Sequence, residues 1–147
     1  MASHPGQRTI LLAEDSTSDL MLVERALSRL DSPVALYVVR NGEEAIAYLQ
    51  GEREYANRQR YPFPDLVMTN MKMPRITGME LLAWIRQQPE LQPLPVVVMS
   101  SSNDPDEFER ATELHVNSYF VKPLRLEDLV ETVRSIVALL PSFDSRA

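Results

Sequence analysis

Two hydrophobic patterns alternate along the chain. In the first, a few apolar residues follow one another directly, as from Ile10 to Ala13; in the second, apolar residues recur every three or four positions, as from Leu20 to Leu30. A short apolar run is typical of a buried strand, and the wider spacing is typical of a helix with one apolar face. The first pattern predicts strands at residues 10–13, 35–39, 66–69, 96–99 and 119–121. The second predicts helices at residues 20–30, 42–49, 79–85, 105–114 and 126–140.

Polar residues and prolines mark where several of these helices begin or end. Asn41 is a good N-cap, and Asp104 followed by Pro105 supplies both a cap and a proline at the first helical position. The polar segment 31–33 ends the first helix. Strand and helix therefore alternate five times. This order predicts an α/β fold with a doubly wound, five-stranded parallel sheet and helices on both faces.

Chemically active side chains gather at the carboxyl ends of four predicted strands. The first strand runs into Glu14 and Asp15, the third into Asn70, the fourth into Ser100, and the fifth into Lys122. In an open parallel sheet the ligand crevice borders these ends, at the point where the order of winding reverses. The sequence therefore predicts a polar site made of an acidic pair, an amide, a hydroxyl and an ammonium group.

The acidic pair needs a cation nearby. Two carboxylates about 4 Å apart repel each other by as much as about 4 kcal/mol at an effective dielectric constant near 20. Hard oxygen ligands with open positions for water suit Mg²⁺ better than a transition metal. The chain has only two lysines, Lys72 and Lys122, against 13 arginines, and both follow predicted strands. A compact ammonium there can hold a carboxylate or phosphoryl oxygen, although two lysines placed there by chance are the alternative.

Length and composition narrow the class of protein. The 147 residues include 15 Lys plus Arg against 21 Asp plus Glu, which gives a formal net charge of −6. An acidic balance disfavours nucleic acid, since neutralising phosphates requires a basic face. Cysteine is absent, which excludes disulfides and thiolate metal sites, and no apolar run is long enough for a membrane span. We therefore expect a soluble, cytoplasmic, single-domain protein that binds neither nucleic acid nor membrane.

Five segments of the chain together resemble the receiver domains of two-component response regulators. They are the first strand with its acidic pair, the third strand, the Met-Pro and glycine loop after it, the fourth strand with its hydroxyl, and the fifth strand with its aromatic and Lys-Pro pair. These segments occupy residues 10–15, 64–70, 73–78, 96–101 and 119–123. Their order and spacing agree with the family over nearly the whole chain. The resemblance implies the flavodoxin-like receiver fold.

The resemblance also implies a phosphorylation switch with a bound cation. In that family a sensor histidine kinase passes a phosphoryl group to an aspartate that follows the third strand. Mg²⁺ lies beside this aspartate, held by the acidic pair, the acceptor and a backbone carbonyl two residues further on. In this chain the implied metal ligands are Glu14, Asp15, Asn70 and the carbonyl of Lys72.

A second group of residues is implied to respond to phosphorylation. Ser100 and Lys122 would approach the phosphoryl oxygens, and Tyr119 would swing inward and change the face made by the fourth helix, fifth strand and last helix. The family's lysine–proline pair has a cis peptide bond, so the resemblance implies one between Lys122 and Pro123 that aims the ammonium into the pocket. No residue is expected to be catalytic, and the chain is not expected to be an enzyme.

The acceptor position of this chain departs from the family, because it holds Asn70 in place of aspartate. An amide oxygen is neutral and its lone pairs are delocalised, so Asn70 cannot form an acyl phosphate, although it can still ligate a cation through its oxygen. The pocket also has one negative charge fewer, and weak or absent Mg²⁺ binding is expected. The other site residues look intact, which favours a recent or deliberate replacement of the aspartate over a natural, long-standing loss of phosphorylation.

Two segments are similar to those of single-domain regulators that work with phytochrome-type histidine kinases, namely 51–65 and 114–117. By itself, the charged segment 51–65 is expected to be an extended end of the second helix and a solvated loop, with a partner-contact loop as the alternative. We expect one receiver domain over 1–147, with a core of about 8–140 and no output domain. The signal would then leave by protein contact, and a homodimer through the fourth helix, fifth strand and last helix is expected.

Two other functions compete with that of a stand-alone regulator. The first is a pseudo-receiver, a phosphorylation-independent interaction module that kept the fold and lost the chemistry. The second is a nucleotide-binding enzyme on the same scaffold, which would need a glycine-rich turn after the first strand. That turn is instead acidic and hydroxyl-rich over residues 14–18, and its carboxylates would repel a pyrophosphate. The nucleotide hypothesis is therefore weak.

Overall fold

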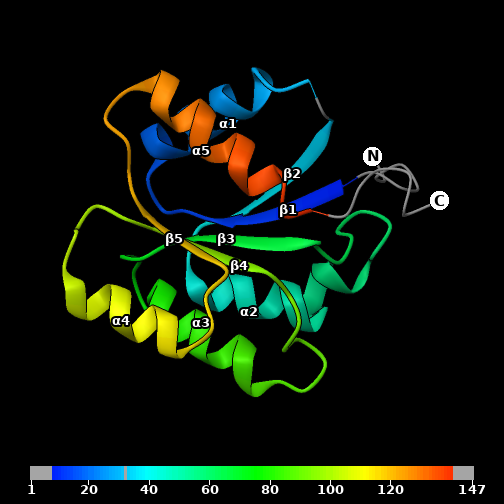
Figure 1. Ribbon diagram of the computed structural model, residues 1–147. Helices are drawn as coiled ribbons and strands as arrows, with labels where there is room; N and C mark the ends of the chain where they lie inside the picture. Colours follow the sequence, from blue (N-terminus) through cyan, green and yellow to red (C-terminus); the bar gives the residue numbers. More distant parts are fainter. Residues whose placement is uncertain (1–7, 32, 141–147) are drawn as a thin grey trace.

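A five-stranded parallel sheet forms the centre of the computed structural model, which describes residues 8–31 and 33–140 (Figure 1). The strands lie in the order β2-β1-β3-β4-β5. Their bounds are β1 (Arg8–Ala13), β2 (Val34–Val39), β3 (Leu66–Asn70), β4 (Val96–Ser100) and β5 (Ser118–Val121). The ends of the predicted domain, residues 1–7 and 141–147, lie outside the described residues.

Helices cover both faces of the sheet, as the alternation of strands and helices predicts (Figure 1). On one face lie α1 (Thr17–Ser28) and α5 (Leu126–Val137), and on the other lie α2 (Gly42–Gln50), α3 (Gly78–Gln87) and α4 (Pro105–Glu113). Winding reverses between β1 and β3, so their carboxyl ends border the crevice of this fold. The predicted fold class is confirmed. Of the helices that the structure describes, none has the length and apolar composition of a membrane span.

The core consists of two apolar layers, one on each side of the sheet. Neighbouring residues of β1 alternate between them: Ile10 and Leu12 pack with α1 and α5, whereas Leu11 and Ala13 pack under α2, α3 and α4. All four are fully buried. Both faces of the central strands are therefore covered, which explains why these strands are continuous apolar runs rather than alternating ones.

The predicted helix caps are confirmed, but the last helix is shorter than its apolar pattern. The side chain of Asn41 accepts a hydrogen bond from the backbone of Glu44 at 2.9 Å, and that of Asp104 accepts one from Asp106 at 3.0 Å. The last helix ends at Val137, whereas the pattern predicts a helix to residue 140. The pattern extends further because Leu140 is also buried, although it lies in a turn after the helix.

The segment between α2 and β3 differs from the expected extension of the helix. The helix ends at Gln50 because Gly51 adopts a left-handed conformation with φ of 69°. A short 3-10 helix, η1 (Arg53–Ala56), follows. The guanidinium of Arg58 reaches back to donate hydrogen bonds to two carbonyls at the end of α2, those of Tyr48 at 2.9 Å and of Leu49 at 3.1 Å.

A cluster of tyrosines packs part of this segment against the domain, while residues 52–54, 56–57, 59–60 and 63 are exposed as expected of a solvated loop. The ring of Tyr48 is buried, and the rings of Tyr55 and Tyr61 pack against it with centroid distances of 4.9 and 6.0 Å. The hydroxyl of Tyr48 donates to the carbonyl of Pro62 at 2.8 Å. Aromatic contacts of this kind give a long connection a fixed path.

Candidate functional site

Parallel register brings the predicted site residues to one edge of the sheet. Ala13 of β1 lies beside Thr69 of β3, and Asn70 lies beside Met99 of β4. The residues just after these positions therefore share the carboxyl edge of the sheet. Their side chains form two groups there. We call Glu14, Asp15, Asn70 and the carbonyl of Lys72 the acidic cluster, and Ser100, Glu107 and Tyr119 the hydroxyl cluster.

The Asn70 side chain is the centre of the acidic cluster. Its amide nitrogen donates to the carbonyl of Lys72 at 2.9 Å, to the carboxylate of Glu14 at 3.2 Å and, more weakly, to the carboxylate of Asp15 at 3.5 Å. Asn70 itself is buried. The other three groups that sequence resemblance assigns to a cation thus surround the amide nitrogen of Asn70.

Glu14 is the most deeply buried member of the acidic cluster. Its side chain is 0% exposed, and this burial raises the pKa of its carboxyl above the ordinary value. A hydrogen bond from the backbone of Ser16 at 3.1 Å and the positive charge of Lys122 act in the opposite direction. Burial is the largest influence on this pKa, so the charged form of Glu14 depends on its polar neighbours.

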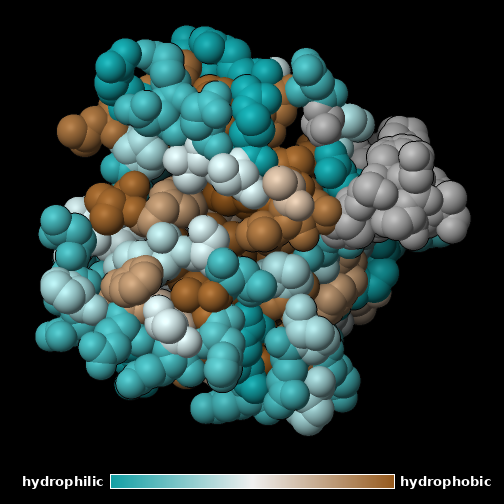
Figure 2. Space-filling view, viewed as in Figure 1, coloured by the Kyte–Doolittle hydropathy of each residue, from teal (hydrophilic) through white to brown (hydrophobic). Residues whose placement is uncertain are grey.

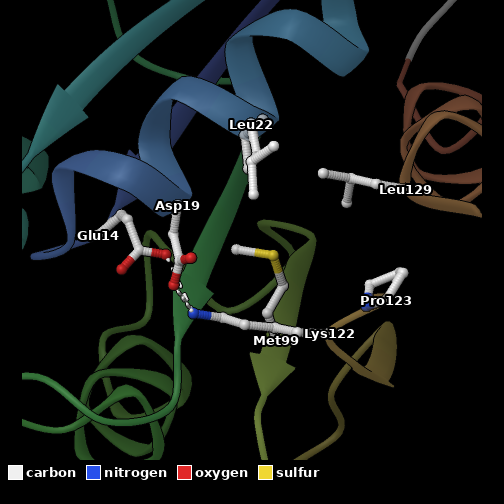
Figure 3. A pocket seen from close by; sticks show the side chains of 8 residues that line it. Glu14, Asp19, Leu22, Met99, Lys122, Pro123 and Leu129 are labelled. Carbon is white, nitrogen blue, oxygen red and sulfur yellow. Dashed lines mark hydrogen bonds and ion pairs between the residues drawn. The ribbon is translucent and has the colours of Figure 1, made fainter. Parts of the chain in front are cut away.

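The ammonium of Lys122 bridges two carboxylates beside the cluster (Figure 3). Its Nζ atom lies 2.6 Å from Asp19 Oδ2 and 3.4 Å from Glu14 Oε1. Next to this bridge is a small cavity of about 50 Å³, whose other lining residues include Leu22 and Met99. The ammonium is therefore already paired with two carboxylates. One of them, Asp19, lies on α1 and was not indicated by the residues at the strand ends.

The expected cis peptide bond before Pro123 is wrong. The peptide bonds that the structure describes, including that between Lys122 and Pro123, are trans. The trans form is the ordinary one even before proline, by about 0.5–1 kcal/mol. The four-carbon side chain of Lys122 is long enough to reach Glu14 and Asp19 from a trans bond, so the ammonium still points into the acidic region.

In the hydroxyl cluster, one carboxylate oxygen of Glu107 on α4 accepts two hydrogen bonds. Ser100 Oγ donates to Glu107 Oε1 at 3.1 Å, and the hydroxyl of Tyr119 donates to the same atom at 3.0 Å. Burial raises the pKa of Tyr119, and the bond to Glu107 acts in the same direction. The rings of Phe108 and Tyr119 pack edge to face at a centroid distance of 5.6 Å. Ser100 and Tyr119 are thus joined through Glu107.

The loop after β3 holds Asn70 tightly. The N–H of Met71 donates to the carbonyl of Met99 at 2.7 Å, and the N–H of Gly78 donates to the carbonyl of Met71 at 2.8 Å. A Cβ atom at Gly78 would lie only 2.3 Å from the carbonyl oxygen of Asn70. Because backbone occupies that space, the start of α3 can approach the end of β3 this closely only with glycine.

Sequence reasoning missed two members of the site, Asp19 and Glu107. Both lie in the first turn of a helix, three residues after an N-cap, at Ser16 and Asp104 respectively. An acidic residue at that position is ordinarily explained by the helix dipole alone. The signal that could have found them is their place in the first turn of the helix that follows a strand end carrying a site residue.

The donor set of the acidic cluster fits a hard divalent cation. Two carboxylates and one backbone carbonyl converge closely enough to contact a single nitrogen atom. Oxygen ligands of this kind, completed by water, suit Mg²⁺. Over residues 8–31 and 33–140 there is no set of three or more His, Cys, Asp or Glu side chains placed to hold a metal, so a carbonyl and an amide would have to complete this one.

The sheet order and the polar edge define a class of protein, the flavodoxin-like signalling receivers. A family profile described as "Response regulator receiver domain" matches residues 10–134. This chain therefore belongs to the response regulator receiver domain family, and the resemblance seen in the sequence is confirmed.

Response regulators, one of them from a cyanobacterial phytochrome system, are similar to this chain in sequence and structure. "Response regulator Rcp1" of Synechocystis sp. (strain ATCC 27184 / PCC 6803 / Kazusa) is 39% identical over 129 residues, which are 88% of this chain and 86% of the relative. The phosphorylated cyanobacterial phytochrome response regulator RcpA superposes with a TM-score of 0.82 and 38% identity, over 92% of this chain and 99% of that one. The Mn²⁺-bound form of Rcp1 superposes with a TM-score of 0.81 and 37% identity, over the same shares. The predicted similarity to such regulators is also confirmed.

Proposed function

We propose that this chain is a stand-alone receiver that works with a sensor histidine kinase of the phytochrome type and that takes no phosphoryl group in its present form. The similarity to the cyanobacterial phytochrome response regulator RcpA supports the partner. Asn70 supports the absence of phosphorylation, because its amide stands at the acceptor position and has no anionic oxygen to attack phosphorus. Its nitrogen, moreover, is turned toward Glu14 and Lys72.

A cation belongs to the same proposal. The ligands would be the carboxylates of Glu14 and Asp15, the carbonyl of Lys72 and the side chain of Asn70, and binding would be weak or absent. When bound, Mg²⁺ supplies positive charge that offsets the carboxylates and the oxygens of a phosphoryl group. The relative solved with Mn²⁺ supports a divalent cation in this family. In this chain Asn70 provides one anionic oxygen fewer than an aspartate would.

The proposal also assigns roles to the residues that would respond to phosphorylation. Ser100 and Lys122 would serve phosphoryl oxygens through a hydroxyl and an ammonium group, with Pro123 fixing the backbone after the lysine. Tyr119 would report the change at the surface, and its contacts with Glu107 and Phe108 on α4 support this role.

The proposal is tested with a small phosphodonor. In the presence of Mg²⁺, acetyl phosphate should leave this chain unmodified in intact-mass analysis. The Asn70→Asp variant should gain one base-labile phosphoryl group, as a carboxylate oxygen bonds to phosphorus and acetate departs. Asn103→Asp makes the same change at an exposed position and should gain nothing. Modification of the unaltered chain, or of the Asn103→Asp variant alone, would contradict the proposal.

The pseudo-receiver is the second candidate function. It is favoured because the acidic cluster already has an internal hydrogen-bond donor. The amide of Asn70 donates to Glu14, to Asp15 and to the carbonyl of Lys72. Under this alternative, partner binding is independent of phosphorylation. Binding of a phytochrome-type kinase and self-association should then be equal in this chain and in phosphorylated Asn70→Asp. A change of either on phosphorylation supports the switch instead.

We also propose a homodimer through α4, β5 and α5. Large apolar side chains are exposed on this side of the molecule: Phe108 is 54% exposed, Val121 is 44% exposed and Leu124 is fully exposed. Figure 2 shows hydrophobic surface across the middle of this view, where β5 passes between α4 and α5 in Figure 1. In a two-fold interface each substitution acts twice.

Sedimentation over a range of concentrations tests the dimer. The unaltered chain should associate, and Val121→Glu should be a monomer because it buries two charges at the interface. Met21→Glu is the control, since Met21 is 63% exposed on α1 outside the proposed interface. A monomeric parent, or a Val121→Glu variant that associates normally, would exclude this interface and leave segment 51–65 as the next candidate surface.

A further inference from the structure

The side-chain nitrogen of Asn70 lies among the other three proposed cation ligands. The distances from Asn70 Nδ2 are 2.9 Å to the carbonyl of Lys72, 3.2 Å to Glu14 and 3.5 Å to Asp15. A cation held by these groups would have to occupy the space between the same oxygens. The amide and the cation are thus alternatives for one position.

The chemistry of the amide fixes how it must be turned. An amide nitrogen has two N–H bonds and can donate to two acceptors fully, which accounts for two short contacts and a longer third one to Asp15. The amide oxygen has no proton to donate, so turning it inward would set it against the carboxylates of Glu14 and Asp15. An aspartate at this position could not donate in its ionised form either, and only a cation would then hold the three carboxylates together.

We propose that the amide nitrogen of Asn70 takes the place of the divalent cation and holds the ligands assembled without metal. A cation enters only after this nitrogen has turned away from Glu14, Asp15 and the carbonyl of Lys72. This inference rests on the proposed cation site, and it adds a second reason why Mg²⁺ should bind weakly. The site is closed by a bound donor, in addition to having lost one negative charge.

Replacement of Asn70 by alanine separates occupancy from charge. Asn70→Ala has the same formal charge as the parent but has neither amide oxygen nor amide nitrogen. If weak binding reflects lost charge alone and the amide oxygen is a ligand, alanine binds Mg²⁺ more weakly than asparagine does. If the nitrogen blocks the site, alanine binds about 10- to 150-fold more tightly, which is the range of ratios that one hydrogen bond to a charged group is worth.

Calorimetric titration with Mg²⁺ and with Mn²⁺ is therefore carried out on the parent and on the alanine and aspartate variants. The expected order of affinity is Asn70→Asp, then Asn70→Ala, then the parent. Asn103→Ala removes an exposed amide outside the acidic cluster and should bind as the parent does. An order in which the parent exceeds Asn70→Ala overturns this inference and leaves the proposed function intact. If Asn70→Asp binds neither ion, the cation site itself is wrong.

A measurement on the unaltered chain covers the case in which a variant does not fold. In metal-free solution, the two side-chain amide protons of Asn70 should be shifted and protected from exchange in nitrogen–proton NMR spectra, relative to those of Asn103. Saturating Mg²⁺ should shift the Asn70 pair and remove its protection. Rapid exchange of the Asn70 protons in the metal-free protein overturns the inference.

Discussion

The acidic and hydroxyl clusters lie at neighbouring strand ends and are organised in opposite ways. In the acidic cluster one donor, the amide of Asn70, serves three acceptors. In the hydroxyl cluster one acceptor, a carboxylate oxygen of Glu107, serves two donors, Ser100 and Tyr119. Each cluster is therefore held by a single central side chain, and the two centres have opposite hydrogen-bonding character.

This difference matters because a phosphoryl group brings only acceptors and a divalent cation only positive charge. A phosphoryl group would compete with Glu107 for the hydroxyl of Ser100, whereas a cation would compete with Asn70 for Glu14 and Asp15. Lys122 belongs with the acidic cluster by its contacts, although its expected role is toward phosphoryl oxygens. In this structure the polar groups of both clusters are thus bonded to the protein's own side chains.

Removal of the ammonium should produce the largest change in stability. Lys122→Met leaves the buried carboxylate of Glu14 and that of Asp19 without their cation, and we expect the free energy of unfolding to fall by about 3 kcal/mol. Urea unfolding measures this change. Lys72→Met is a matched control, because the other lysine has an exposed side chain and only its carbonyl belongs to the acidic cluster. Equal stability of the two variants would show that the bridge does not hold the acidic cluster together.

Removal of the central acceptor should have a smaller effect. Glu107→Ala leaves the hydroxyls of Ser100 and Tyr119 without their shared acceptor, and we expect the free energy of unfolding to fall by about 1–2 kcal/mol. Glu109→Ala changes the same residue type on an exposed face of the same helix and should fall within about 0.5 kcal/mol of the parent. If both variants lose the same stability, Glu107 acts through the helix rather than through the hydroxyls.

Removal of one donor should have a still smaller effect. Tyr119→Phe keeps the ring contact with Phe108 but deletes one of the two hydrogen bonds to Glu107, and about 0.5–1 kcal/mol should be lost in urea unfolding. Combined with Glu107→Ala, Tyr119→Phe should lower the free energy of unfolding by almost nothing more, because the carboxylate that accepts its hydrogen bond is already absent. Full additivity of the two changes would contradict a direct bond between these side chains.

The smallest expected effect is a pH dependence that belongs to the acidic cluster. Burial raises the pKa of Glu14 in the folded state, so above the ordinary glutamate pKa of 4.5 the folded protein holds a proton that the unfolded chain has already released. Stability from this group therefore falls as pH rises through its folded pKa. Glu14→Gln should remove that decline in urea unfolding curves measured from pH 4 upward, whereas Glu24→Gln, at an exposed position of α1, should keep it. A decline of equal size in both variants would assign it to other groups.

The sequence predicts most of this architecture for a clear physical reason. Buried parallel strands are continuous apolar runs, and Asn41 and Asp104 cap helices with their own side chains, so both features are local. Parallel register then brings the residues after β1, β3, β4 and β5 to one edge without further information. The strand ends therefore suffice to predict that Glu14, Asn70 and Lys122 come together.

The remaining features depend on packing between distant segments. Whether Asp19 reaches Lys122, or Glu107 reaches Tyr119, is decided by how a helix lies on the sheet, which no local pattern contains. The path of segment 51–65 likewise depends on Arg58 reaching back to the end of α2. The implied cis bond before Pro123 came from resemblance alone, and the structure has a trans bond there.

The hydrogen bond between Met71 and Met99 affects how this protein ages chemically. Asparagine slowly deamidates to a carboxylate when the backbone nitrogen of the next residue attacks its side-chain carbonyl carbon. Here that nitrogen belongs to Met71, whose N–H donates to the carbonyl of Met99 at 2.7 Å, so cyclisation would have to break the bonding around the end of the sheet. Asn70 should therefore remain an amide during long storage, as peptide mapping by mass spectrometry can check. The folded chain would not drift into a phosphorylatable form, whereas the unfolded chain has no such protection.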